Sequence, residues 1–145
     1  MRRIGIFSAV LALCLMAPFS MAKGPKHHFE ARGSSGVVRY WGNGTVHLEG
    51  RGTVKIRNLS KIRIDIDAEY GEVETITDGK IYHHFDGILT ASGLGGHLEI
   101  RGWDIRLEAD GFGKAWVKGR EGTWNLDGES GTWPEKKWKK IKFRG

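Results

Sequence analysis

The sequence contains a single cysteine, Cys14, among its 145 residues. Cys14 lies in a stretch with the features of a secretory signal peptide: two arginines, an apolar run over residues 4–17, and small residues before a cleavage position after Ala22. We therefore expect residues 1–22 to be removed and the mature chain to be exported to the periplasm or the extracellular space. That chain has no cysteine, which excludes disulfides, thiol nucleophiles and cysteine-based metal sites.

Two other interpretations of this segment remain open. Cys14 would be the lipid acceptor of a lipoprotein signal, although Leu13, directly before it, is larger than the small residue that such a signal requires. Alternatively, the segment would be retained as an N-terminal anchor. For the mature chain, residues 23–145, we expect no transmembrane segment.

Catalytic motifs are also lacking. There is no G-x-S-x-G elbow, phosphate loop or dinucleotide fingerprint. His83 and His84 are adjacent, so a strand would point them to opposite faces, where they cannot chelate one metal together. Asp65 and Asp67 have the spacing of any solvated strand face, without the glycine position of a calcium loop. We predict no catalytic residue, no metal site and no cofactor.

No segment shows helical spacing of apolar residues over three turns, whereas glycine is abundant, with 22 residues. Glycine punctuates an eight-residue repeat, in which GTVHLE from Gly44 is followed by GTVKIR from Gly52. Alternation of apolar and polar residues within each repeat predicts a half-buried strand of about six residues. The predicted inward residues of this first series are Val38, Tyr40, Val46, Leu48, Val54, Ile56, Ile62 and Ile64.

A second series of repeats begins at Gly79, after a linking segment with a weak strand near residues 73–77. Its phase slips by one residue near Gly95 and Gly96, which predicts a β-bulge. The predicted inward residues of this series are Ile81, Leu89, Leu98, Ile100, Ile105, Leu107, Ala115, Val117, Trp124 and Leu126. They are mostly aliphatic, which favours a filled core over an empty lumen.

The repeats predict an all-β fold, an antiparallel meander of about 10–12 short strands closed as a barrel or folded as a sandwich. A β-solenoid is the alternative, and we favour the meander because Gly-x-Gly turns are expected to reverse the chain. The predicted organisation is a flexible mature N-terminus over residues 23–35, one all-β domain over 36–130, and a basic C-terminal strand or tail over 131–145.

The phrases GTVHLEGRGTVKI and FDGILTASGLGGHLEIRGWDIRLEADGFGKAWVKGREGTW, together with the signal peptide, resemble an uncharacterised class of small, glycine-punctuated, all-β exported bacterial proteins. The resemblance spans roughly residues 36–127 and rests on the style of the repeat. It implies an all-β fold and export, and it implies no activity. Bactofilins and adhesin-type β-solenoids are similar in their short strands, but their longer rungs do not match the eight-residue repeat.

Positive charge is concentrated at the C-terminus, although the formal net charge of the whole sequence is only +6. Six cations of the last ten residues are interleaved with aromatic and aliphatic side chains, and two further tryptophans fall on the outward phase of the repeats. Basic patches with aromatic residues suit anionic polymers and lipid headgroups. The candidate ligand-binding residues are Lys136, Lys137, Lys139, Lys140, Lys142, Arg144, Trp138, Trp41 and Trp116.

These features favour a non-enzymatic exported domain that binds or scaffolds in the cell envelope or matrix. Its expected partners are anionic envelope polymers or lipid headgroups, and we expect no specific recognition of nucleic acid. The same lysines would also protect an edge strand from aggregation. Alternatives are a subunit that self-associates into a surface filament or layer, a small lipid carrier, and a polysaccharide-active enzyme.

Overall fold

The computed structural model describes residues 26–144, so the predicted signal peptide and its alternatives lie outside the described residues. This part of the chain contains one short 3-10 helix, η2 (Leu59–Lys61), and no α-helix. All the strands pair antiparallel in one sheet. They are β1 (His27–Arg57), β2 (Ile62–Glu69), β3 (Val73–Ile76), β4 (Gly79–Arg120), β5 (Thr123–Leu126), β6 (Glu129–Thr132) and β7 (Lys139–Phe143).

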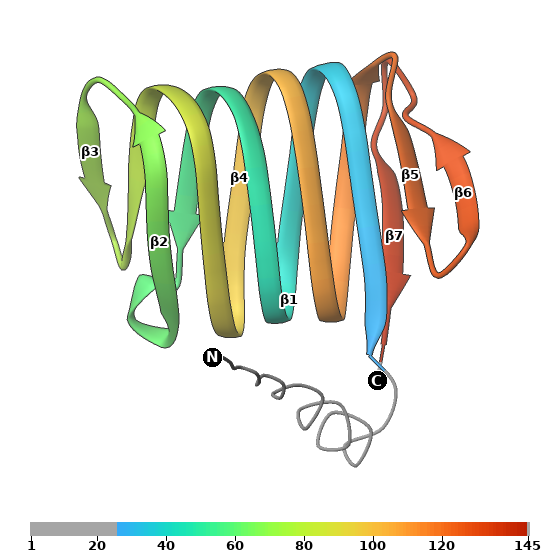
Figure 1. Cartoon of the computed structure of the whole chain (residues 1–145), viewed down its shortest axis with the longest axis horizontal. Coiled ribbons are helices and arrows are strands. Elements are labelled where there is room, and N and C mark those ends of the chain that lie inside the picture. The colour runs from blue at the N-terminus through green and yellow to red at the C-terminus, as the bar shows by residue number, and fades with distance from the viewer. Residues whose placement is uncertain (1–25, 145) are drawn as a thin grey trace, which may run out of the picture.

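The strands β1 and β4 are 31 and 42 residues long and wind together as a two-stranded flattened coil (Figure 1). Most positions between Ser35 and Arg57 of β1 pair with two turns of β4. Ile100 of β4 lies opposite both Val38 and Val54 of β1, which are sixteen residues apart. One turn of β1 therefore takes two of the eight-residue repeats, and each repeat crosses one of the two layers of the coil.

Glycines form the corners of the coil. Gly44 and Gly52 have φ angles of 127° and 142°, a region that residues with a side chain rarely adopt. At these corners the backbone bends from one layer to the other while its pairing to the neighbouring strand continues. The prediction that each Gly-x-Gly reverses the chain was therefore wrong. A two-residue type I′ hairpin turn needs positive φ at two consecutive residues, whereas the chain here only bends and stays paired.

The all-β, antiparallel prediction is confirmed, but the predicted meander of many short strands is not what forms. Seven strands are present in residues 26–144, and the sheet order is β2-β4-β1-β5-β6, with β3 and β7 also paired to β4. The sheet is not closed as a barrel; its two layers face each other as in a sandwich. The solenoid alternative correctly expected corners that only bend. Its repeats would stack as rungs one after another along the chain, whereas adjacent turns here are antiparallel and come alternately from β1 and β4.

The two ends of the coil are built differently (Figure 1). At one end β2 and β3 each pair with β4, and at the other β7 pairs with β4 while β5 and β6 form a hairpin. The segment predicted to be a flexible N-terminus, residues 23–35, includes the start of β1, where Phe29 and Ala31 are fully buried. The basic C-terminal segment contributes β7, whose Ile141 and Phe143 are also buried.

The core lies between the two layers, and the alternation predicted most of it. Ile62, Ile64 and Leu126 are only partly buried, and Ile81 is replaced by Tyr82 and Phe85. Tyr82 points inward in place of Ile81 because β4 has one residue more than β1 between the pairs Gly52–Phe85 and Val54–Tyr82, and His84 in this bulge has a φ of 56°. The predicted inward residues found buried are Val38, Tyr40, Val46, Leu48, Val54, Ile56, Leu89, Leu98, Ile100, Ile105, Leu107, Ala115, Val117 and Trp124.

The predicted β-bulge is confirmed. Gly42 lies opposite Gly96 and Gly44 opposite Gly93, so β4 has one residue more than β1 between these pairs. Gly95 has a φ of 72°, and its backbone N–H donates to the side-chain oxygen of Asn43 at 2.7 Å. The extra residue moves β4 back into phase, which places Leu98 and Ile100 in the core.

Candidate functional site

Outward side chains on one layer of the coil form three rows that cross the strands. Directly opposed residues of antiparallel strands point to the same face, so the pairing register defines each row. The first row is Lys142, Lys114, Trp41, His97 and Arg57; the second is Lys140, Trp116, Arg39, Glu99, Lys55, Ile81 and Glu74; the third is Lys118, Val37, Arg101 and Thr53. We call this surface the basic face.

The basic face carries eight lysines and arginines and two glutamates. Its cations come from β7, from two turns of β4 and from two turns of β1. Neighbouring strands are about 4.8 Å apart and alternate residues of one strand about 6.7 Å apart, so these charges form a regular array. A flat array of this kind can contact many phosphates or carboxylates of an extended anion at once.

The cations of this face are crowded. The pKa of Lys142 lies below its usual value because Lys140 and Arg144 carry the same charge close by. The pKa of His97 is also lowered, first by burial and then by Arg57. Like charges held together in this way favour binding of an anion, because the anion relieves their repulsion.

Three tryptophan rings lie among these cations. The Nζ atom of Lys114 is 5.2 Å from the centre of the Trp41 ring, and that of Lys140 is 5.7 Å from Trp116. Trp138 lies between Arg39 and Lys118, at 4.6 Å and 4.9 Å. The two contacts of Trp138 hold the residues before β7 against the sheet.

Glu99 is the buried carboxylate at the centre of the basic face. Only 8% of the residue is exposed, and its carboxylate accepts a hydrogen bond from Nε of Arg39 at 2.7 Å. Arg101 is farther away, with 4.0 Å between its Nη2 atom and the carboxylate. Glu99 therefore neutralises Arg39 and leaves the other cations of the face largely uncompensated.

The opposite layer has the reverse charge. Its rows are set by the pairing of β5, β1, β4 and β2. They contain the carboxylates Glu30, Glu49, Asp65, Asp67, Glu108 and Asp110 and the arginines Arg32, Arg63 and Arg106. Two of these arginines are bound to carboxylates of the same layer, since Arg32 pairs with Glu30 and Arg106 with Glu108. The molecule is thus charged oppositely on its two faces.

The structure brings together five of the nine candidate residues: Lys140, Lys142, Trp138, Trp41 and Trp116 lie on or against the basic face. Lys136 and Lys137 are exposed in the segment before β7. Lys139 turns away, and its Nζ atom is 5.8 Å from the Trp124 ring. Arg144 borders a groove of about 280 Å³ that is also lined by Trp41, Phe112 and Lys114.

The sequence interpretation missed the cations that β1 and β4 contribute. These are Arg39, Lys55, Arg57, Arg101, Lys114 and Lys118. Each occupies an outward place of its repeat, so alternation alone assigns it to the surface. Which of the two surfaces it joins depends on the register between strands.

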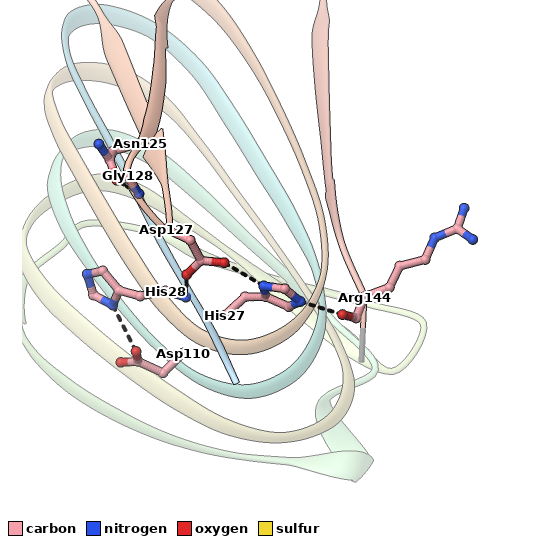
Figure 2. A network of polar contacts seen from close by, with 7 residues as sticks. All are labelled: His27, His28, Asp110, Asn125, Asp127, Gly128 and Arg144. Carbon is pink, nitrogen blue, oxygen red and sulfur yellow. Dashed lines mark hydrogen bonds and ion pairs between the residues drawn. The ribbon is translucent and has the colours of Figure 1, made fainter. Parts of the chain in front are cut away.

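A clasp of polar contacts joins the two ends of the described chain (Figure 2). The imidazole of His27 lies between the carboxylate of Asp127, 2.5 Å from Nδ1, and the backbone carbonyl of Arg144, which Nε2 contacts. Asp127 also accepts a hydrogen bond from the backbone N–H of His28 at 2.9 Å. The Arg144 side chain extends away from the clasp in Figure 2.

Only a protonated His27 can donate to both acceptors, because a neutral imidazole has one N–H. The hydrogen bond to Asp127 raises the pKa of His27 above 6.5, and the Arg144 carbonyl raises it further. The stability that this clasp contributes is therefore fully present below about pH 6.5 and is lost as the pH rises through the folded-state pKa.

We expect His27→Asn to lower the melting temperature more at about pH 5.5 than at about pH 8.5, because only the protonated imidazole makes both bonds. Thermal unfolding of both proteins at each pH measures the difference. As a control, Asp127→Asn should lower the pKa of His27, followed by NMR, towards 6.5. If His27→Asn lowered the melting temperature more at about pH 8.5 than at about pH 5.5, a protonated His27 in the clasp would be contradicted.

Among residues 26–144, no cluster of three or more His, Cys, Asp or Glu side chains is arranged to hold a metal ion. The same residues include no helix long and apolar enough to cross a membrane. No family model, curated protein or solved structure matches this chain.

Proposed function

We propose that the protein is a non-enzymatic, exported binding domain that places its basic face against an anionic polymer or a surface of anionic headgroups in the cell envelope or matrix. The observation that carries the proposal is the register of β7, β4 and β1, which gathers eight cations on one layer. The basic C-terminal strand is one edge of this surface.

Charge segregation supports an oriented mode of binding. The opposite layer carries six carboxylates and three arginines, so an anionic surface would attract one face and repel the other. The exported location expected from the signal peptide would bring the protein to lipopolysaccharide, acidic polysaccharide or extracellular DNA. All three present the closely spaced anions that such an array would neutralise.

The tryptophans support contact with more than charge alone. Trp41 is 43% exposed, although Lys114 lies near its ring. A bound anion would draw the lysine ammonium group away and free the ring to stack on a sugar or a base. The basic face would then combine electrostatic attraction with apolar contact.

Binding to a polyanion should be strongly sensitive to salt, because each lysine that contacts an anion releases a counterion. We expect the chain without residues 1–22 to bind lipopolysaccharide and DNA at low ionic strength. The triple variant Lys114→Gln, Lys140→Gln, Lys142→Gln should bind at least about tenfold more weakly, with a salt dependence shallower by up to about 3 units. Fluorescence anisotropy at several salt concentrations measures both quantities.

The matched control removes the same charge elsewhere. Lys26, Lys61 and Arg63 are exposed and lie outside the three rows, so their replacement by Gln gives the same net charge. It should leave affinity within about twofold of that of the unmodified chain. If both triple variants weakened binding equally, the affinity would depend on the net charge of the protein and not on the basic face, and the proposal would be contradicted.

A second candidate function is self-association through the ends of the coil. The strands β3 and β7 pair only with β4, so each leaves one edge open. β3 carries Glu74, whereas β7 carries Lys139, Lys140 and Lys142. A head-to-tail contact between these ends would repeat as a filament. Light scattering distinguishes the two functions, since only self-association gives polymers without a polyanion.

A further inference from the structure

A cleft of about 480 Å³ opens at one corner of the coil, beside the basic face. Its floor is backbone, because Gly36 and Gly52 of β1 lie on either side of Gly102 of β4. A Cβ atom at Gly102 would lie 1.9 Å from the carbonyl oxygen of Arg51, so this close packing requires glycine. The volume is in the range of small-molecule sites, about 300–1,000 Å³.

The walls of the cleft bring together an indole, a guanidinium group and two imidazoles. Trp103 is 57% exposed, the largest exposed fraction among the large apolar side chains described. Arg101 belongs to the third row of the basic face, and its side chain is 61% exposed. His83 and His84 come from the bulged part of β4 and also line the cleft.

Arg101 is available to an anion. Its nearest carboxylate, that of Glu99, is 4.0 Å away and already accepts a hydrogen bond from Arg39. His83 is oriented by Glu74, whose Oε1 atom is 3.2 Å from Nε2 of the imidazole. The cleft therefore offers a planar cation beside an exposed aromatic face, with imidazole groups as further hydrogen-bonding partners.

A sugar ring that carries a carboxylate or phosphate matches these groups. The C–H face of the ring would lie on Trp103, the anion would pair with Arg101, and the imidazoles would bind ring hydroxyls. A neutral sugar would leave the guanidinium unpaired, and a bare anion would leave the indole exposed. We propose that the cleft binds one acidic sugar residue of the polyanion that contacts the basic face.

This inference rests on the proposed function, because the basic face would hold the rest of the polymer chain. Arg101 and Thr53 belong to both surfaces, so a saccharide in the cleft continues directly onto the three rows. The cleft would then give the interaction a chemical preference that the array of cations alone lacks. Long polyanions of any kind would bind the face, but only acidic saccharides would also fill the cleft.

Isothermal titration calorimetry with tetragalacturonic acid, maltotetraose and inorganic phosphate tests the proposal. The acidic tetrasaccharide should bind at least about tenfold more tightly than either of the others. Trp103→Ala and Arg101→Gln should each weaken it by about tenfold. Arg63→Gln, on the opposite layer and outside the three rows, should change it by less than about twofold. Circular dichroism would verify that each variant remains folded.

The outcomes separate this inference from the proposed function. Equal binding of the neutral tetrasaccharide or of phosphate, or unchanged affinity in both cleft variants, would overturn the acidic-sugar assignment. Absence of tetrasaccharide binding in a protein that still binds lipopolysaccharide or DNA would overturn it too, while the function of the basic face would stand. Failure to bind any polyanion at low salt would overturn both.

Discussion

Replacing Gly44 with alanine should destabilise the protein by about 2–5 kcal/mol, because the substitution strains the backbone and forces a contact at the same position. The φ angle of Gly44 is 127°, and a Cβ atom there would lie 2.0 Å from the carbonyl oxygen of Asp110. That oxygen is backbone of the adjacent turn of β4 and can move only if the corner opens. The expected loss is a large part of the 5–15 kcal/mol typical of a small domain.

Gly128→Ala is the matched control. Gly128 has a φ of 97°, but a Cβ atom there would meet nothing within 4 Å. Only the dihedral strain remains, and we expect a cost of about 1–2 kcal/mol. Urea unfolding followed by circular dichroism measures both variants. Similar losses in the two would show that the corners of the coil are not tightly packed; failure of Gly44→Ala alone to fold would support the tight corner.

The strands and their inward faces could be predicted because alternation is a local property. Val46 and Leu48 are assigned to the core by their immediate neighbours alone. Whether a glycine reverses or only bends the chain depends on the partner strand, and Gly44 pairs with Gly93 and Gly111, far along the chain. No local pattern contains that information, so the coil was not predicted.

In the structure, the hairpin and the bends differ in their φ angles. The hairpin between β5 and β6 turns at Asp127 and Gly128, two adjacent residues with positive φ. That is the requirement of a two-residue reversing turn. At the corner of Gly42 and Gly44, Gly44 has a positive φ but Asn43 before it does not. Asn-Gly is as suitable for a two-residue reversing turn as Asp-Gly, so the pairing with β4, and not the residue types, decides that the chain bends here.

The basic face was only partly predictable, for a related reason. Successive repeats of β1 alternate in charge: Arg39 is followed by Glu49 in the next repeat and by Lys55 in the one after. Because a turn takes two repeats, alternate repeats lie on the same layer, and like charges accumulate there. The C-terminal lysines were conspicuous because they are adjacent in sequence, whereas the cations of β1 and β4 are gathered by pairing.

Trp133→Ala should cost about 3–5 kcal/mol of unfolding free energy, the usual loss for a buried tryptophan. Trp133 is only 6% exposed and lies over Gly33 and Gly122, where a Cβ atom would be 2.3 Å and 2.1 Å from its ring. Its Nε1–H donates to the carbonyl oxygen of Thr123 at 3.0 Å. The two glycines thus form a slot for the ring, which anchors the segment leading to β7.

The comparison with Trp103→Ala makes this prediction specific to the slot. Trp103 is 57% exposed, so its loss should change stability by less than about 1 kcal/mol. Trp133→Phe keeps an aromatic ring but loses the hydrogen bond to Thr123, and an intermediate cost of about 1–2 kcal/mol is expected. Urea unfolding of the three variants measures this order. If Trp133→Ala were as mild as Trp103→Ala, β7 would not depend on the slot, and cations of the basic face would have to be held in place by the Trp138 contacts instead.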